Sequence, residues 1–181
     1  MAWPLAALCA FGRWLGAYRF FAQACALVPG FPGDGLRIAF YKLVLPECSL
    51  SSRICFGSYF AHPTARLGRR VYIGSYCVLG QVVIGERTQI ATAVQVLSGG
   101  QQHMREPGGE ISFSEGEFRW VRIGADCWIG AGAIVMQDIG ERSTIGAGSV
   151  VTRPIPPESV AVGAPARVIR STREDARGEQ R

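Results

Sequence analysis

An aliphatic residue recurs every six positions from residue 67 onward, and a glycine often follows it. The phase slips by one residue between Leu79 and Ile84, and the pattern resumes at Ile123 after an interruption. The buried residues of a helix would be spaced by three and four positions, and those of a half-buried strand would alternate with polar ones. A period of six therefore predicts neither a single helix nor a single long strand. It is typical of short strands separated by turns, three of which complete one triangular coil. The aliphatic positions are Leu67, Ile73, Leu79, Ile84, Ile90, Val96, Ile123, Ile129, Val135, Ile145 and Val151.

A second position keeps the same period, because a small or β-branched residue stands four residues after most of the aliphatic ones. We expect both positions to point into a prism, the second being small because the corner is tight. We expect the glycine after the aliphatic residue to relieve backbone strain at the turn. Cys77 and Cys127 are then small core fillers without a catalytic role. The small positions are Val71, Cys77, Val83, Thr88, Val94, Cys127, Ala133 and Ser149.

Two segments lie outside this period. Residues 98–120 are polar and Gly-rich, and a long stretch of this kind inside a repeat is usually a functional loop. From Arg153 a Pro-rich segment ends the repeat with a final extended piece. The predicted organisation is an apolar helical extension over residues 1–50, a β-helix domain over 51–170 that contains the loop, and a polar, disordered tail over 171–181.

The N-terminal extension is apolar and aromatic, yet Arg13 and Arg19 interrupt it. Its charge-free run from Met1 to Gly12 is too short to cross a bilayer, and it lacks the basic start and small-residue cleavage site of a signal peptide. We interpret it as an amphipathic helix that docks on a partner subunit or lies on a membrane surface. An ordinary helix packed on the domain is an equally open interpretation.

Charge and cysteine content narrow the partners and the compartment. The net charge is +5 and comes almost entirely from arginine, since Lys42 is the only lysine. The arginines are scattered and no nucleic-acid-binding motif is present, so we expect a phosphate-bearing small ligand and no nucleic acid. The six cysteines form no C-x-x-C pair, which argues against a zinc site or a redox motif. We expect reduced thiols in a cytoplasmic protein.

Several motifs resemble the hexapeptide-repeat O-acetyltransferases: VRIGADCWIGAGAIV, STIGAGSVVTRPIPPESVAVGAPARVIR and the His-bearing loop. The segment VPGFPGDGLRIAFYKLVLPECS, with FAHP at residues 60–63, resembles the branch found in bacterial polysaccharide gene clusters. The resemblance spans about residues 28–171. It implies an all-β, left-handed parallel β-helix that forms a homotrimer with active sites between adjacent subunits. It also implies an acyltransferase that moves an acetyl group from acetyl-CoA to a sugar hydroxyl in polysaccharide or glycan biosynthesis.

The resemblance also assigns a catalytic base. Acyl transfer needs a group that takes the proton of the attacking hydroxyl and a donor that stabilises the oxyanion, and an imidazole suits the first task at neutral pH. Of the two histidines, His103 lies in the loop where the family keeps its base, and His62 is interpreted as structural or as a turn residue. Counted without gaps from Ile84, the histidine of the galactoside type falls on Gln101, so the assignment of His103 depends on a longer loop. The acid that orients the imidazole is left open among Glu106, Glu110, Glu115 and Glu117, which can equally form a solvated loop face.

Matching the motifs residue by residue implies the coenzyme A contacts. The residues of CWIGAGA would contact the pantetheine arm, and those of IGAGS and VVTR would line the groove further along. The arginines of GAPARVIR would approach the phosphates or the adenine, because a guanidinium binds phosphate bidentately and stacks on a base. Alternatively, none of these side chains binds coenzyme A: Trp128 packs at a contact between subunits, and the arginines are solvated. The implied cofactor-binding residues are Trp128, Ala131, Ala147, Thr152, Arg153, Arg167 and Arg170.

Other functions on this fold match the sequence less well. A γ-class carbonic anhydrase needs three histidines around its metal, and this chain has two, so no metal site is expected. A non-catalytic trimeric scaffold needs neither the His-bearing loop nor the C-terminal motif. The serine acetyltransferase type carries a large helical domain before its prism. An enzyme for a small metabolite or a sugar nucleotide stays open, as does a location at the inner face of the cytoplasmic membrane, where lipid-linked glycans are built.

Overall fold

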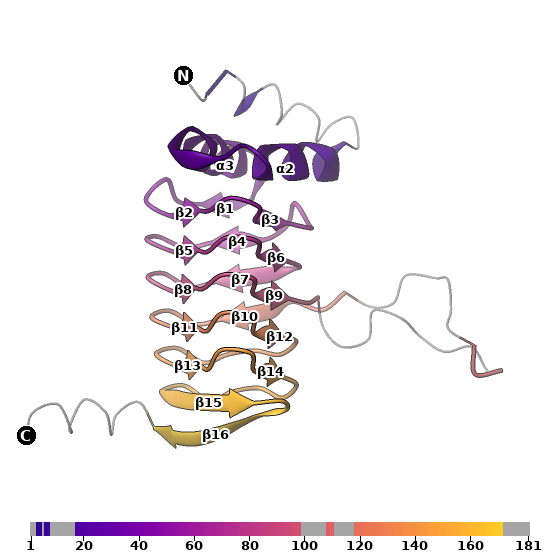
Figure 1. The fold of residues 1–181 in the computed structure, drawn as a ribbon, viewed down its shortest axis with the longest axis vertical. Helices are drawn as coiled ribbons and strands as arrows, with labels where there is room; N and C mark the ends of the chain where they lie inside the picture. The colour runs from indigo at the N-terminus through magenta and orange to yellow at the C-terminus, as the bar shows by residue number, and fades with distance from the viewer. Residues whose placement is uncertain (1–2, 5, 8–16, 99–107, 111–117, 172–181) are drawn as a thin grey trace, which may run out of the picture.

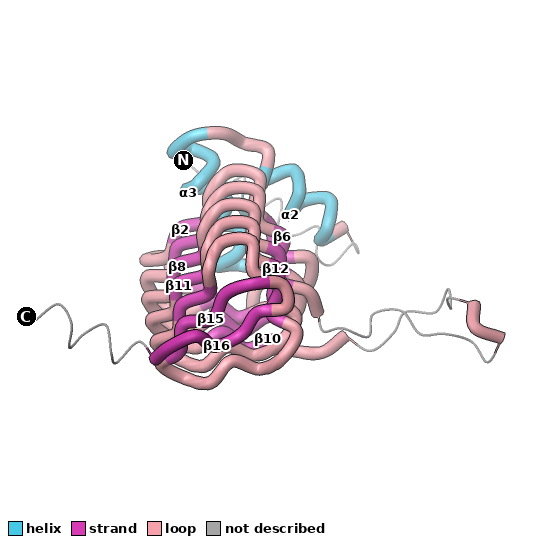
Figure 2. The backbone as a smooth tube through the Cα atoms, turned by 60° about the horizontal axis from the view of Figure 1, so that its bottom comes forward, coloured by secondary structure: helices cyan, strands magenta, loops and turns pink. Residues whose placement is uncertain are grey.

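The computed structural model of the protein describes residues 3–4, 6–7, 17–98, 108–110 and 118–171. Helices α2 (Tyr18–Ala26) and α3 (Gly30–Val44) lie across one end of a stack of short strands, and the chain ends at the opposite end (Figure 1). The strands wind into a left-handed parallel β-helix of about five turns, as the sequence predicts. A view tilted toward the C-terminal end shows the coils stacked along a single axis (Figure 2).

Three sheets form the sides of the prism, and the chain passes through them in the same order in successive coils. Sheet A contains β1 (Glu47–Cys48), β4 (Arg66–Leu67), β7 (Val82–Ile84) and β10 (Val121–Ile123). Sheet B contains β2 (Arg53–Ile54), β5 (Tyr72–Ile73), β8 (Gln89–Ile90), β11 (Trp128–Ile129), β13 (Thr144–Ile145), β15 (Ser159–Gly163) and β16 (Ala166–Ser171). Sheet C contains β3 (Tyr59–Phe60), β6 (Val78–Leu79), β9 (Gln95–Val96), β12 (Ile134–Val135) and β14 (Val150–Val151).

The ends of the prism lie close to the expected boundaries. The first strand, β1, begins at Glu47, within the segment that the sequence assigns to the helical extension. Sheet A is extended below β10 by single bridges that join Ile123 to Ile139 and Ile139 to Ile155. The last strand, β16, runs antiparallel to β15 and closes the C-terminal end. Its final residue is Ser171, and residues 172–181 lie outside the described part of the chain.

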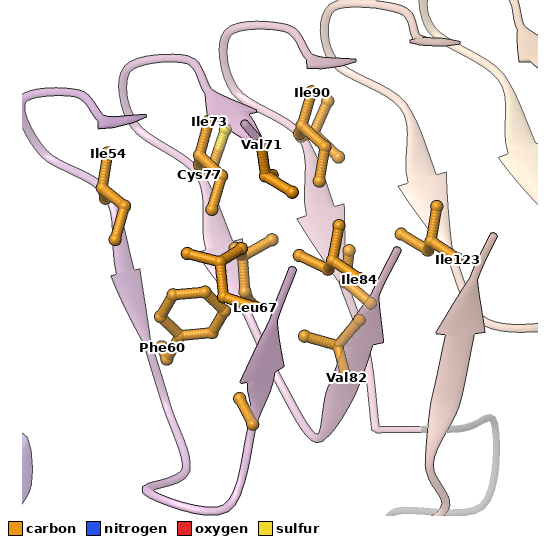
Figure 3. Close-up of a cluster of buried hydrophobic side chains, with 14 of the residues drawn as sticks. Ile54, Phe60, Leu67, Val71, Ile73, Cys77, Val82, Ile84, Ile90 and Ile123 are labelled. Carbon is orange, nitrogen blue, oxygen red and sulfur yellow. The ribbon is translucent and has the colours of Figure 1, made fainter. Parts of the chain in front are cut away.

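The predicted aliphatic positions form the core. Leu67 pairs in register with Ile84, and Ile84 pairs with Ile123, so each side chain stacks on its counterpart one coil away (Figure 3). Every aliphatic residue of the period is at most 2% exposed. Burial of one such side chain stabilises the fold by roughly 1.5–3 kcal/mol, and no coil can bury its own alone. The period of six therefore reports the stacking of coils.

The second inward position follows the prediction except at the phase slip. Val83 was expected to point inward, but it is half-buried, and Val82 is fully buried in its place. Side chains alternate along a strand, so the inward position is the one two residues before the next aliphatic residue. Only five positions separate Leu79 from Ile84, and counting forward from Leu79 therefore selects the wrong neighbour.

The glycines after the aliphatic residues allow successive coils to approach closely. The expectation that they relieve backbone strain at the turn is therefore wrong. Gly85 and Gly130 do not have positive φ, and a Cβ added to either would come closer than 3.0 Å to the backbone of the next coil. The left-handed backbone lies elsewhere in the corners, mostly at other residue types such as Arg87 (φ 59°) and Ala93 (φ 60°). Sequence reasoning identified the special positions but assigned them the wrong physical cause.

The small inward residues also join the coils through hydrogen bonds. The Thr88 hydroxyl donates to the Gly124 carbonyl at 2.7 Å and accepts from the Cys127 N–H at 3.2 Å, both one coil away. Ser52, Ser58 and Ser143 make the same pair of contacts in other coils. The Cys127 thiol donates to the Gly140 carbonyl at 3.1 Å. These positions thus satisfy buried corner backbone, which explains why they are often Ser, Thr or Cys.

A buried arginine fixes the helices to the first coil. Arg37 of α3 is fully buried, and its guanidinium donates to the Ile54 carbonyl of β2 at 2.8 Å and to the Val28 carbonyl at 2.7 Å. It also donates to the carbonyls of Cys25 and Ala26 at the C-terminal end of α2, at 3.1 and 3.3 Å. Asp34 balances its charge. The described helices are therefore packed on the domain, which confirms one of the open interpretations for this part of the extension.

Candidate functional site

Three edges run along the prism where the chain passes from one sheet to the next. We name them AB, BC and CA after the sheets that they join. The inserted segment leaves the prism after β9 and returns at β10, so it belongs to edge CA (Figure 1). The predicted cofactor residues are distributed over sheet B, edge BC and edge CA, and all seven side chains are exposed.

The predicted base, His103, lies outside the described residues, as do Gln101, Glu106, Glu115 and Glu117. Of the acidic residues considered as its partner, Glu110 is described, and it is exposed. The role of His103 therefore stays a prediction. What the structure does describe is the root of the segment that carries it, where the Arg119 N–H donates to the Ser98 carbonyl at 2.9 Å.

His62 lies on edge CA as well, in the corner between β3 and β4. Its ring contacts the ring of Phe118 in the returning part of the inserted segment, with centroids 5.0 Å apart. Its carbonyl accepts a hydrogen bond from the Tyr18 hydroxyl at 3.3 Å. The sequence interpretation of His62 as a turn residue describes its place but missed this contact, because neither residue belongs to the six-residue period.

Edge BC becomes a column of small, exposed residues in its lower coils, below the exposed ring of Tyr76. The Gly132 N–H donates to the Thr92 carbonyl at 2.9 Å, and the Gly148 N–H donates to the Ala131 carbonyl at 2.8 Å, so successive corners lie one above another. A Cβ added at Gly132 or Gly148 would meet no heavy atom within 4 Å, and both have left-handed backbone, at φ 68° and 66°. Ala131 and Ala147 are thus neighbours on an open edge that exposes backbone.

Trp128 stands beside this edge on the outer face of sheet B. Its side chain is 59% exposed, and its strand neighbours in register are Gln89 and Thr144. The hairpin of β15 and β16 continues sheet B, and it places Arg167 opposite Val162. Trp128, Ala131, Ala147, Arg167 and Arg170 therefore belong to one surface region that comprises sheet B and edge BC.

Thr152 and Arg153 lie elsewhere. They follow β14 of sheet C and occupy edge CA, two coils below the level where the inserted segment leaves the prism. Sheet C separates them from Ala131 and Ala147 within one prism. The motif-based assignment therefore divides into two groups on different edges, and sequence matching alone gives no sign of this division.

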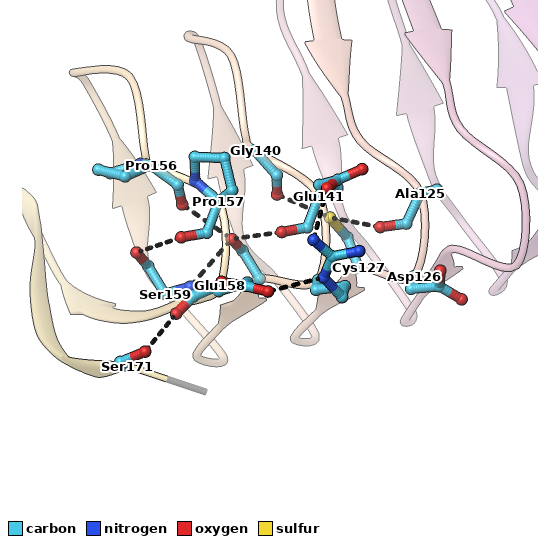
Figure 4. Close-up of polar contacts among 12 residues, drawn as sticks. Ala125, Asp126, Cys127, Gly140, Glu141, Pro156, Pro157, Glu158, Ser159 and Ser171 are labelled. Carbon is cyan, nitrogen blue, oxygen red and sulfur yellow. Dashed lines mark hydrogen bonds and ion pairs between the residues drawn. The ribbon is translucent and has the colours of Figure 1, made fainter. Parts of the chain in front are cut away.

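Edge AB carries a ladder of ion pairs. Arg69 contacts Glu86, Arg87 contacts both Glu86 and Asp126, and part of the lower ladder is drawn in Figure 4. The neighbouring guanidinium of Arg87 lowers the pKa of Asp126, and it lowers the pKa of Glu86 as well. These charges partner one another from coil to coil, which is a structural role.

Three of the described thiols are poor nucleophiles. Desolvation by burial raises the pKa of Cys77 and of Cys127, and it raises the pKa of Cys48 to about 12. A reactive cysteine needs the opposite shift, toward the thiolate. Within residues 17–98, 108–110 and 118–171, no cluster of three His, Cys, Asp or Glu side chains has the arrangement of a metal site.

Comparison with known proteins agrees with this architecture. A family profile described as the hexapeptide repeat of succinyl-transferase matches residues 120–153. These residues carry the repeat that the profile describes. Nodulation protein L of Rhizobium meliloti strain 1021 is 38% identical over 110 residues, which are 56% of this chain and 57% of that protein. Galactoside O-acetyltransferase of Escherichia coli K12 is 39% identical over 94 residues, which are 49% and 43% of the two chains.

A crystal structure described as galactoside acetyltransferase in complex with coenzyme A superposes with a TM-score of 0.78. It is 25% identical, and the superposition covers 92% of this chain and 85% of that chain. The chain spans about half of the length of the curated relatives that it matches. The relatives include acetyltransferases.

Proposed function

We propose that the protein is an acyl-CoA-dependent O-acyltransferase that transfers an acetyl group from acetyl-CoA to a sugar hydroxyl. The observation that carries the proposal is the open edge BC, which leads from Trp128 to the basic β15–β16 hairpin. A thin, flexible pantetheine chain suits an edge built of Ala131, Gly132, Ala147 and Gly148, because no side chain beyond a methyl group projects there. Its amides find exposed backbone partners along the edge.

The charges at the end of this edge suit a nucleotide phosphate. Arg167 and Arg170 are exposed on β16, and a guanidinium binds phosphate oxygens bidentately. Trp128 offers an exposed indole on the same surface region, on which an apolar part of the donor packs. The related acetyltransferase of the structural comparison is described as a complex with coenzyme A, which supports this donor.

His103 is the proposed general base. It accepts the proton of the acceptor hydroxyl as the oxygen attacks the thioester carbonyl, and the carbon–sulfur bond breaks when the tetrahedral intermediate collapses. The proton then passes to the departing thiolate, so the products are the acetyl ester and free coenzyme A. A backbone N–H is the proposed oxyanion donor. Burial and the raised pKa of the Cys77 and Cys127 thiols favour this direct transfer over an acyl-cysteine intermediate at either residue.

A homotrimer would unite the two groups of predicted donor contacts. Thr152 and Arg153 on edge CA cannot share a groove with Ala131 and Ala147 on edge BC of one prism, because sheet C lies between them. Packing of adjacent prisms brings edge CA of one subunit toward edge BC of the next. The outer face of sheet C supports such packing, since its column is mostly apolar and consists of Tyr59, Val78, Gln95, Ile134 and Val150.

The helical end supports contact with a membrane surface. Phe20 on α2, Leu27 just after it and Phe31 at the start of α3 are 67%, 69% and 82% exposed. Arg19 and Lys42 are exposed on the same helices. Apolar side chains flanked by cations suit the surface of an anionic bilayer. Neither described helix has the length and hydropathy of a membrane span.

We infer a cytoplasmic enzyme that acts in polysaccharide or glycan biosynthesis, next to the membrane where lipid-linked acceptors are assembled. The thiols of Cys48, Cys55, Cys77 and Cys127 are free, which suits a reducing compartment. A sugar nucleotide or a small metabolite is the alternative acceptor, and a trimeric β-helix scaffold without activity is the alternative function.

The test is release of coenzyme A from acetyl-CoA by the full-length protein in the presence of sugar acceptors. We expect acceptor-dependent release in the wild type and a loss of roughly 100-fold or more in His103→Ala, since general-base catalysis contributes about 10² to 10⁴. The variant should retain the circular dichroism spectrum and the oligomeric state of the wild type. Wild-type turnover by His103→Ala would refute the assigned base, and no release by the wild type with any acceptor would favour the scaffold.

A further inference from the structure

Edge CA contains one very short connection between strands, and longer connections lie directly above and below it. The corner between β6 and β7 consists of Gly80 and Gln81 alone. Above it, residues 61–65 join β3 to β4, and below it the inserted segment joins β9 to β10. Because the connection between β6 and β7 is so short, the edge recedes there, and we call this place the notch. The two longer connections lie on either side of it.

Ser98 occupies the notch at the start of the inserted segment. It is 2% exposed, and its hydroxyl accepts a hydrogen bond from the Gln81 N–H at 2.9 Å. Gly80 admits it, because a Cβ at Gly80 would come within 3.0 Å of the Ser98 hydroxyl and backbone. The Ser98 carbonyl in turn accepts from the Arg119 N–H, so the outgoing and returning strands of the segment are joined at its root.

The returning end of the inserted segment contacts the connection between β3 and β4, on the other side of the notch. Phe118 is half-buried, and its ring lies 5.0 Å from the imidazole of His62, at an angle of 58°. The support of His62 is rigid, because its carbonyl and that of Phe60 accept hydrogen bonds from the Tyr18 hydroxyl of α2. An aromatic contact on a fixed support restricts the direction in which the returning strand leaves the prism.

We propose that His62 is a positioning residue that docks the root of the inserted segment through Phe118 and so orients the segment that carries His103. The role rests on the proposed transferase function. It gives the second histidine a part in the reaction without contact to substrate, and it couples the α2 helix to the segment through Tyr18. The role depends on the aromatic ring of His62 and not on its protonation, so phenylalanine is the conservative replacement.

Amide hydrogen exchange of the full-length protein tests the contact between His62 and Phe118, which we call the dock, independently of enzymatic activity. We expect His62→Ala to speed exchange at the Arg119 amide by roughly two- to tenfold, as befits the loss of one aromatic pair, and His62→Phe to leave it near the wild-type rate. Phe118→Ala should have the same effect as His62→Ala, and the double variant should add little to either. Thr64→Ala, an exposed substitution in the same corner, is the matched control.

Turnover tests the consequence for the reaction. We expect His62→Ala to lower kcat for acetyl transfer by a similar factor with little change in KM for acetyl-CoA, and His62→Phe to restore it. Unchanged exchange at Arg119 in His62→Ala would overturn the dock, and faster exchange with unchanged kcat would overturn the positioning role. If the wild type has no transferase activity, the proposed function fails, while exchange at Arg119 still decides the dock.

Discussion

The guanidinium of Arg87 binds the carboxylate of Asp126 through two hydrogen bonds of 2.6 and 2.7 Å. The two residues occupy the same corner of successive coils, and the whole inserted segment lies between them in sequence. Both have left-handed backbone, at φ 59° and 56°. The ladder on edge AB therefore continues across the insertion, which leaves the prism from edge CA without disturbing the other edges.

The Arg87–Asp126 pair should give a small, pH-dependent stabilisation. The pKa of Asp126 is lowered in the folded protein, so its contribution is present above the ordinary range for Asp, near pH 4, and is lost as the pH falls through the lower folded value. We expect Asp126→Asn to lower Tm by less than about 3 °C at pH 7, since the pair is exposed. The difference from the wild type should shrink in thermal scans below pH 4. A difference that grew on acidification would contradict this assignment.

Gly130 and Gly132 should respond differently to alanine. A Cβ at Gly130 would collide with the backbone of Ala147, so Gly130→Ala should cost about 1–3 kcal/mol of unfolding free energy. Gly132 faces open space, and Ala93 already has the same backbone conformation one coil earlier, so Gly132→Ala should cost about 1 kcal/mol. Chemical denaturation of the two variants compares these costs. Equal losses would show that close approach of coils does not select glycine.

Arg167→Ala should raise the KM for acetyl-CoA by roughly tenfold with little change in kcat, because one charge-assisted hydrogen bond to phosphate is lost. Steady-state kinetics with acetyl-CoA measures the effect, and acetyl-dephospho-CoA identifies which phosphate is involved. Arg69→Ala is the control, since Arg69 is equally exposed but lies on edge AB. An unchanged KM in Arg167→Ala would remove β16 from the donor site.

Ile134→Asp should weaken the proposed trimer. Ile134 lies in the apolar column on sheet C, between Gln95 and Val150. A buried carboxylate without a partner is strongly unfavourable, so the variant should dissociate at concentrations where the wild type remains trimeric. Light scattering after size-exclusion chromatography measures the mass. Val83→Asp places the same charge on the outer face of sheet A and should leave the trimer intact, and a trimeric Ile134→Asp would exclude sheet C from the interface.

Removal of the exposed apolar side chains at the helical end should weaken membrane binding. We expect the double substitution Leu27→Ser with Phe31→Ser to lower co-sedimentation with vesicles that contain anionic lipid by roughly tenfold. Ile169→Ser is the control, because Ile169 is 59% exposed at the opposite end of the prism. Equal sedimentation of the wild type and the double variant would refute the membrane surface as the partner of this end.

The sequence predicted the architecture well because the architecture is local and repeated. One buried contact recurs in every coil, so a single period carries the inward positions from Leu67 to Val151. The same counting failed at Val83, where the coil is shortened, since a count along the chain cannot show which of two neighbouring valines turns inward. It also failed to explain the glycines, because the atoms that exclude a Cβ belong to the next coil.

The amino-acid sequence by itself determined the repeat, the inward side chains and the place where the repeat is interrupted, because these depend on spacing along one chain. Only the tertiary structure decided which residues share an edge. It separated Thr152 and Arg153 from Ala131 and Ala147, buried Arg37 among carbonyls, and brought Phe118 to His62. Such contacts join corners of different coils, and their distance in sequence depends on the lengths of the excursions between them, which the period does not encode.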